Sequence, residues 1–128
     1  MRAVAVFNED EHTLKCFQLA FPDSVVDSHD YKTTEELRNI LRNMKYEYLA
    51  FPAANNKEDT VKLCKEINLL APYSACLVLV NMKQVSQIKY IFKAGCKVLV
   101  KPVDRIQLKI LFQDQTKVYD RHNDARLL

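Results

Sequence analysis

The stretch that most constrains the fold of this chain is Cys76–Val103, with the sequence CLVLVNMKQVSQIKYIFKAGCKVLVKPV. Its pattern predicts a strand over Cys76–Val80, an amphipathic helix over Gln84–Ala94 and a second strand over Val98–Val100. Gly95, the only glycine of the protein, follows the predicted helix at the place where a left-handed residue ends many helices. A strand, a helix and a strand within about 30 residues form a βαβ unit, which predicts a parallel sheet.

The apolar residues of this unit indicate what its elements pack against. Within the predicted helix they recur at helical spacing and predict a single apolar face made of Val85, Ile88, Ile91 and Phe92. The run Val98–Val100 is apolar without polar alternation, which is typical of a strand covered on both faces.

The rest of the chain repeats the same alternation of short apolar runs and amphipathic segments. Further strands are expected at Ala3–Phe7, Ser24–Ser28 and Tyr46–Phe51. Further helices are expected at His12–Phe21, at Thr34–Asn43 behind a Thr33/Glu36 capping box, in a segment capped by Asp59, and from Asp104 to about Tyr119. Five βα units in strict alternation predict an α/β, doubly wound (βα)5 fold. Its five-stranded parallel sheet is expected in the order 2-1-3-4-5, with helices on both faces.

Length and composition fit one ordinary globular domain. The 128 residues are 48% hydrophobic and 27% charged, and the net charge of +3 is too small to indicate nucleic-acid binding by itself. No apolar run has the length of a membrane helix, and no signal-peptide pattern opens the chain, so we expect a cytoplasmic protein. The cysteines lack CxxC spacing and are expected to be reduced core or near-core thiols: Cys16, Cys64, Cys76 and Cys96. We expect one domain over residues 1–118, with 119–128 as a tail or the start of a linker helix.

Three segments resemble parts of one family, the receiver domain of two-component response regulators, which has a CheY-like (flavodoxin-like) fold. AGCKVLVKPVDRIQL resembles the end of that domain, where the last strand finishes in a Lys-Pro pair. VAVFNEDEHT resembles its first strand and acidic cluster, and YEYLAF followed by DTVKLCKEI resembles its third strand and the next helix. The resemblance covers roughly residues 1–118 and implies the same fold and a role in signal transduction, within a two-component system or phosphorelay.

The resemblance also implies which positions would carry chemistry. Receivers accept phosphate on an aspartate at the end of the third strand. Acidic residues after the first strand hold Mg²⁺, while a Ser/Thr and a lysine contact the phosphoryl group. Here the phosphoacceptor position falls on Pro52, which offers neither a nucleophile nor a metal ligand. The two acidic positions fall on Asn8 and Glu9, with Asp10 next. The Ser/Thr position falls on Val80, with Asn81 adjacent, and the family's aromatic switch position on the fifth strand falls on Val98. Only the lysine position is unchanged, at Lys101.

These departures predict a pseudo-receiver that keeps the fold and has lost the phosphorylation chemistry. We expect no catalytic residue, no enzyme activity and no metal site or cofactor, with Mg²⁺ binding weak or absent. A remnant pocket is expected from Asn8, Glu9, Asp10, Val80, Asn81 and Lys101. Within it, we expect Lys101 to pair with Glu9 or Asp10 and hold the loops together.

Three functions follow as hypotheses. The first is phosphorylation-independent protein–protein interaction in signalling, through a face made of Lys89, Lys93, Lys97 and Val98. The partner would be another protein, or a second copy bound through the fourth helix, fifth strand and fifth helix. The alternative is a small-anion or metal sensor that uses Asn8, Glu9, Asp10 and Lys101. An unrelated flavodoxin-like enzyme or nucleotide binder is disfavoured because the chain has no glycine-rich phosphate loop. Neither nucleic acid nor membrane is expected as a partner.

Overall fold

Strands and helices alternate along the whole described part of the chain. The computed structural model describes residues 3–111. Its elements are β1 (Ala3–Phe7), α1 (Glu11–Ala20), β2 (Val25–His29), α2 (Thr34–Asn43), β3 (Tyr48–Pro52), α3 (Lys57–Leu70), β4 (Ala75–Val80), the 3₁₀-helix η1 (Met82–Gln87), α4 (Ile88–Lys93) and β5 (Lys97–Val100). A last helix begins at Arg105 and reaches Leu111, where the description ends. The expected end of this helix and the 119–128 tail therefore lie outside the described residues.

The five strands form one parallel sheet in the order β2-β1-β3-β4-β5. This is the predicted α/β doubly wound arrangement, and it is confirmed. Register places Ala5 beside Leu49 and Leu49 beside Cys76, so the central strands β1, β3 and β4 are aligned along their apolar runs. Each predicted strand lies within two residues of an observed one.

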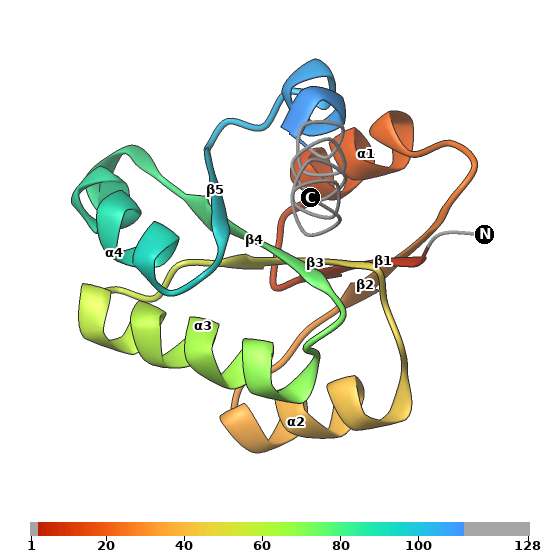
Figure 1. Cartoon of the computed structure of the whole chain (residues 1–128). Coiled ribbons are helices and arrows are strands. Elements are labelled where there is room, and N and C mark those ends of the chain that lie inside the picture. The colour runs from red at the N-terminus through yellow and green to blue at the C-terminus, as the bar shows by residue number, and fades with distance from the viewer. Residues whose placement is uncertain (1–2, 112–128) are drawn as a thin grey trace, which may run out of the picture.

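Helices cover both faces of the sheet (Figure 1). On one face, α2, α3 and α4 pack over a core that includes Leu37, Ile67, Ile91 and the buried thiols of Cys64, Cys76 and Cys96. On the other face, α1 and the last helix pack over a second core through Phe17, Ala20, Phe21 and Leu108. In β5, Val98 and Val100 pack on the first core and Leu99 on the second, as expected for a strand covered on both faces.

Helices α1, α2 and α3 begin at side-chain caps, one of which differs from the prediction. Thr33 caps α2 by accepting from the Glu36 amide at 3.2 Å, while the Glu36 carboxylate reaches the Lys32 amide instead of that of Thr33. The prediction that Asp59 caps α3 is wrong. Asn56 is the cap, and it accepts a 2.8 Å hydrogen bond from the Asp59 amide. Both residue types cap helices well, so sequence alone did not decide between them.

The predicted helix Gln84–Ala94 is divided, and its first half is the 3₁₀-helix η1. The predicted single apolar face is wrong as well. Ile88 and Ile91 contact the core, whereas Val85 and Phe92 are 40% and 56% exposed. A 3₁₀-helix has about three residues per turn, so Val85 does not stay in line with the α-helical residues that follow.

Two further expectations are met. Gly95 has a φ of 88°, in the left-handed region, and ends α4 as predicted. All four cysteines are free thiols, three of them buried and Cys16 half-buried.

Among residues 3–111, no helix is long and apolar enough to cross a membrane.

Candidate functional site

The residues predicted to form a remnant pocket lie at the carboxyl ends of β1, β4 and β5. In a sheet of this order the chain leaves β1 and β3 toward opposite faces, and ligands of such folds bind at the crevice this creates. The structure brings only some of the predicted residues together there.

Lys101 forms the centre of an ion-pair cluster with the two carboxylates that follow β1. Its Nζ lies 2.6 Å from Glu9 Oε2 and 3.2 Å from Asp10 Oδ2. The Glu9 side chain is only 2% exposed, against 28% for Lys101 and 57% for Asp10. The expectation that Lys101 pairs with these carboxylates is confirmed, and the pair ties the β1–α1 loop to the end of β5.

The three groups titrate differently because their surroundings differ. Hydrogen bonds from the Thr13 backbone at the start of α1, aided by Lys101, lower the pKa of Asp10 to about 2. Burial raises the pKa of Glu9, since its hydrogen bond to Lys101 does not fully compensate for lost hydration. Burial alone would lower the pKa of Lys101, but Glu9 and Asp10 together outweigh it and raise that pKa. Asp10 and Lys101 therefore carry opposite charges near neutral pH, with Lys101 as the cation of the cluster.

Asn8 belongs to a different contact from the one predicted. Its Oδ1 accepts from the Tyr31 amide at 2.8 Å and its Nδ2 donates to the Tyr31 carbonyl at 3.0 Å. The backbone of Asn8 is left-handed, with a φ of 51°, and this turn directs the chain out of β1. Both polar atoms of the Asn8 side chain are engaged by Tyr31, so Asn8 joins the β1–α1 loop to the β2–α2 loop. The residues that pair with Lys101 are Glu9 and Asp10.

Pro52 is the last residue of β3, and Val80 the last residue of β4. Val80 is fully buried. Asn8 and Pro52 line a hollow of about 810 Å³ between the first turns of α2 and α3, whereas Glu9, Asp10 and Lys101 do not line it. The predicted pocket is therefore not formed as expected: Glu9, Asp10 and Lys101 make the ion-pair cluster and Asn8 lines the separate hollow. Val80 and Asn81 belong to neither.

Asn81 and two glutamines form a second set of ties that sequence reasoning missed. Asn81 caps η1, and Gln84 completes a capping box with the Asn81 amide at 3.0 Å. The Gln84 and Gln87 side-chain amides each donate to the Ala54 carbonyl at 3.1 Å. The β3–α3 loop is therefore fixed to η1. The spacing Asn81-x-x-Gln84 is a capping-box signal that was available in the sequence.

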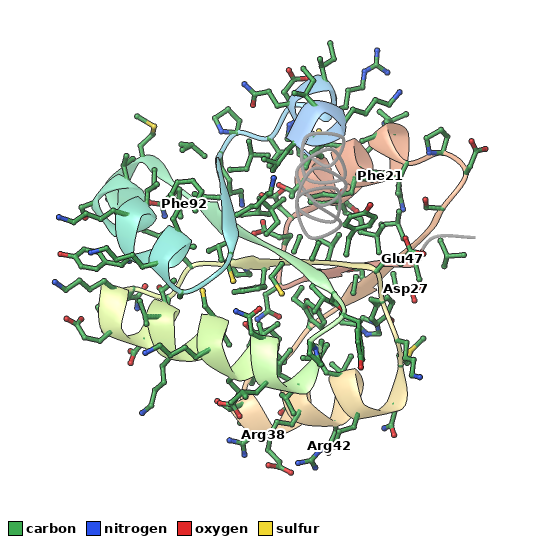
Figure 2. The ribbon with its side chains drawn as sticks, in the orientation of Figure 1. Phe21, Asp27, Arg38, Arg42, Glu47 and Phe92 are labelled. Carbon is green, nitrogen blue, oxygen red and sulfur yellow. The ribbon has the colours of Figure 1, made fainter. Side chains whose placement is uncertain are left out.

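The predicted interaction face lies on α4 and the edge strand β5. Lys89 and Lys93 are exposed, while Lys97 and Val98 are half-buried. Phe92, labelled on α4 in Figure 2, is largely exposed on the same helix as Lys89 and Lys93. In the same view Arg38 and Arg42 lie on the outer side of α2, where Arg38 pairs with Glu35 and with Glu66 of α3. Within residues 3–111, no three His, Cys, Asp or Glu side chains are arranged to hold a metal ion.

Comparison with solved structures shows which fold these elements make. A response regulator from Thermotoga maritima superposes with a TM-score of 0.72 at 20% identity, over 89% of this chain and 96% of that one. A CheY-like receiver domain protein from Methanospirillum hungatei gives 0.69 at 15% identity, over 97% and 98%. The chain has the receiver fold.

The same fold is found in proteins with other names. The pilus assembly protein CpaE from Caulobacter crescentus matches the receiver fold of this chain with a TM-score of 0.71 at 11% identity, over 90% of this chain and 99% of that one. No protein-family model and no curated protein matches the sequence. At these identities the likeness establishes the receiver fold predicted from the three sequence segments, and function has to be argued from the site.

Proposed function

We propose that this chain is an atypical receiver domain that acts in signal transduction without being phosphorylated, through contact with a protein partner. One observation carries the proposal. The strand that ends on the phosphoacceptor in receivers, β3, ends here on Pro52. The loop that follows, 53–56, has the sequence AANN and contains no carboxylate.

The nearest downstream acids do not replace the missing aspartate. Glu58 and Asp59 belong to the first turn of α3, and the Asp59 carboxylate accepts from Asn56 Nδ2 at 3.1 Å. A phosphoacceptor must present a carboxylate to the phosphoryl group, and proline has none. Phosphotransfer at the end of β3 is therefore chemically impossible in this register.

The charge of Lys101 supports the same conclusion. In receivers this lysine is available to the phosphoryl group, whereas here its ammonium group is engaged by Glu9 and Asp10. A divalent cation would have to compete with that ammonium group for the same two carboxylates, so we propose that Mg²⁺ binds weakly or not at all and that the domain needs no cofactor. The free thiols support the expectation of a reducing, cytoplasmic compartment.

The decisive experiment is an amide NMR spectrum titrated with Mg²⁺ and then with beryllofluoride, the acyl-phosphate mimic. We expect no shifts at millimolar Mg²⁺ and none on adding beryllofluoride. The Pro52→Asp variant returns a carboxylate to the end of β3 and tests whether the missing carboxylate accounts for the missing beryllofluoride response. Pro52→Asn is its uncharged control. Beryllofluoride-dependent shifts in the wild-type protein at Asn8–Asp10 and Lys101 would overturn the proposal.

A second candidate function is a small-anion or metal sensor at Glu9, Asp10 and Lys101. The observation that favours it concerns one oxygen of Glu9. Glu9 Oε1 is buried and has no hydrogen-bond partner in the described structure. Burying such an oxygen unpaired costs free energy, and a bound cation or water would remove that cost. Shifts confined to these residues on adding Mg²⁺ alone would place this candidate ahead.

The partner surface proposed for the main function is the α4–β5 face. Lys89 and Lys93 are exposed on it beside Phe92, and Val98 lies on the edge strand. A two-fold symmetric dimer through α4, β5 and the last helix would bring like charges together, so a different protein with an acidic surface fits better. Sedimentation equilibrium tests this. We expect a monomer, and a dimer that dissociates in the Lys89→Glu/Lys93→Glu variant would reverse the choice of partner.

A further inference from the structure

A groove between α3 and α4 has properties that the contacts within the domain do not explain. These two helices lie side by side in Figure 1. The groove has a volume of about 520 Å³ and is lined by Lys57, Glu58, Asp59, Val61, Lys62, Lys65 and Tyr90. It lies on the helical layer and is separate from the ion-pair cluster at the end of the sheet.

Two ammonium groups converge on one phenol ring in this groove. Lys57 Nζ lies 4.3 Å from the ring centroid of Tyr90 and 3.4 Å from its hydroxyl oxygen. Lys89 Nζ lies 5.1 Å from the same centroid. The hydrogen bond and charge of Lys57, followed by the charge of Lys89, lower the pKa of Tyr90.

Neither cation has an acidic partner. Within residues 3–111, no carboxylate lies within ion-pair distance of Lys57, Lys62, Lys65 or Lys89. The segment 67–103, which contributes α4, contains no Asp or Glu at all. Two like charges beside one ring repel each other, and a cation–π contact at an exposed site contributes only about 0.5–1 kcal/mol. The arrangement is thus complementary to a negatively charged group from outside the domain.

We infer that this groove binds an acidic, partly apolar peptide segment of a partner protein, whose carboxylates are held by Lys57 and Lys89 at Tyr90. The inference deepens the proposed function, because it presupposes a domain that acts through protein contacts. A carboxylate between the two ammonium groups would relieve their repulsion, and the Tyr90 hydroxyl would donate to it. Apolar side chains of the segment would lie on Val61 and on the aliphatic stems of Lys62 and Lys65.

The chemistry of the groove favours a peptide over a nucleic acid. Glu58 and Asp59 line one part of it, and they would repel a continuous row of phosphates. The net charge of the whole chain is only +3. A peptide needs carboxylates only at Lys57 and Lys89 and can place apolar side chains near Glu58 and Asp59, whereas a nucleic acid carries a phosphate at every nucleotide.

Selection of a displayed library of random octapeptides against the full chain tests the inference. We expect enrichment of peptides that carry Asp or Glu beside apolar residues. A recovered peptide should shift the amide resonances of Lys57, Val61, Lys65 and Tyr90. Its affinity should fall about tenfold or more in Lys57→Gln/Lys89→Gln, because two charge pairs to the partner are lost.

The matched control is Lys15→Gln/Lys45→Gln, which removes the same charge from exposed lysines outside the groove. Its affinity for the peptide should be unchanged, and both double variants should keep the wild-type thermal unfolding midpoint. Failure to enrich any peptide, enrichment without acidic residues, or equal weakening by both double variants would overturn the inference. So would a 20-base-pair DNA duplex or inorganic phosphate that shifts the same amides when no peptide does. The proposed function fails on a different result, a beryllofluoride response, so the two are tested independently.

Discussion

Lys101 Nζ lies 2.6 Å from Glu9 Oε2, across 92 positions of the chain, and this contact joins the last strand to the loop after the first. The contact is asymmetric, because Glu9 is almost fully buried while Lys101 retains access to water. Removing the lysine would therefore leave a buried carboxylate without its cation.

Lys101→Met should destabilise the domain for this reason. Breaking a buried ion pair costs about 3–5 kcal/mol, and the partial exposure of Lys101 reduces our expectation to about 2 kcal/mol. Urea unfolding monitored by circular dichroism measures the change. The double variant Glu9→Gln/Lys101→Met should recover part of the loss, and an equal or larger loss in the double variant would contradict the pairing.

Asp10 should make the stability of the domain depend on pH in an acidic window. Its pKa is lowered from 3.8 to about 2 on folding, so its contribution is complete above pH 4 and is lost as the pH falls toward 2. Asp10→Asn keeps a residue that caps helices and removes the titrating group. The variant should show a shallower loss of stability between pH 4 and pH 2 in urea unfolding.

Glu9 should act in the opposite direction and at higher pH. Its pKa is raised from 4.5 by burial, so ionising it costs stability as the pH rises above that value. The contributions of the two carboxylates to stability can thus be separated by pH.

The Asp10 prediction is contradicted if the free energy of unfolding of Asp10→Asn falls below pH 4 as steeply as that of the wild-type protein.

The cap of α3 can be tested by two substitutions three positions apart. Asn56→Ala removes the side chain that accepts from the Asp59 amide, and we expect a loss of about 1 kcal/mol. Asp59→Asn removes only a first-turn charge and should cost a few tenths of a kcal/mol. A larger loss of unfolding free energy in Asp59→Asn than in Asn56→Ala would indicate that Asp59 is the cap.

Gly95→Ala should be destabilising by about 1–2 kcal/mol, because a φ of 88° is strained for any residue with a Cβ. The added Cβ would also lie 3.2 Å from Asn68 Nδ2, which donates to the Ala94 carbonyl. Gly95→Asn is the control, since asparagine tolerates the left-handed region better than alanine. Equal unfolding midpoints for the wild-type protein and Gly95→Ala would show that this turn is not strained.

Most of the fold could be predicted because it depends on local patterns. Apolar runs, caps and Gly95 predicted the order of helices and strands along the chain. The pairing of Lys101 with Glu9 or Asp10 was expected from the resemblance to receivers, which places the loops that follow the first and last strands at one end of the sheet. The division of the Gln84–Ala94 helix could not be predicted in this way, because Gln84 and Gln87 bind carbonyls about thirty residues earlier in the chain. The position of Asn8 depends on a left-handed backbone and on Tyr31, and neither is encoded by spacing.

The reciprocal hydrogen bonds between Asn8 and Tyr31 have a mechanical consequence. The side-chain amide of Asn8 accepts and donates as a backbone peptide group would. The hydrogen bonding between β1 and β2 is therefore continued by one more pair of bonds into the loops that follow them. The loop after β3 is joined instead to η1. The carboxyl end of the sheet is therefore braced on both sides of the 810 Å³ hollow at Pro52, and the Lys101–Glu9 contact joins the two sides. We expect thermal motion at this end of the sheet to widen the hollow while the Lys101–Glu9 contact stays formed.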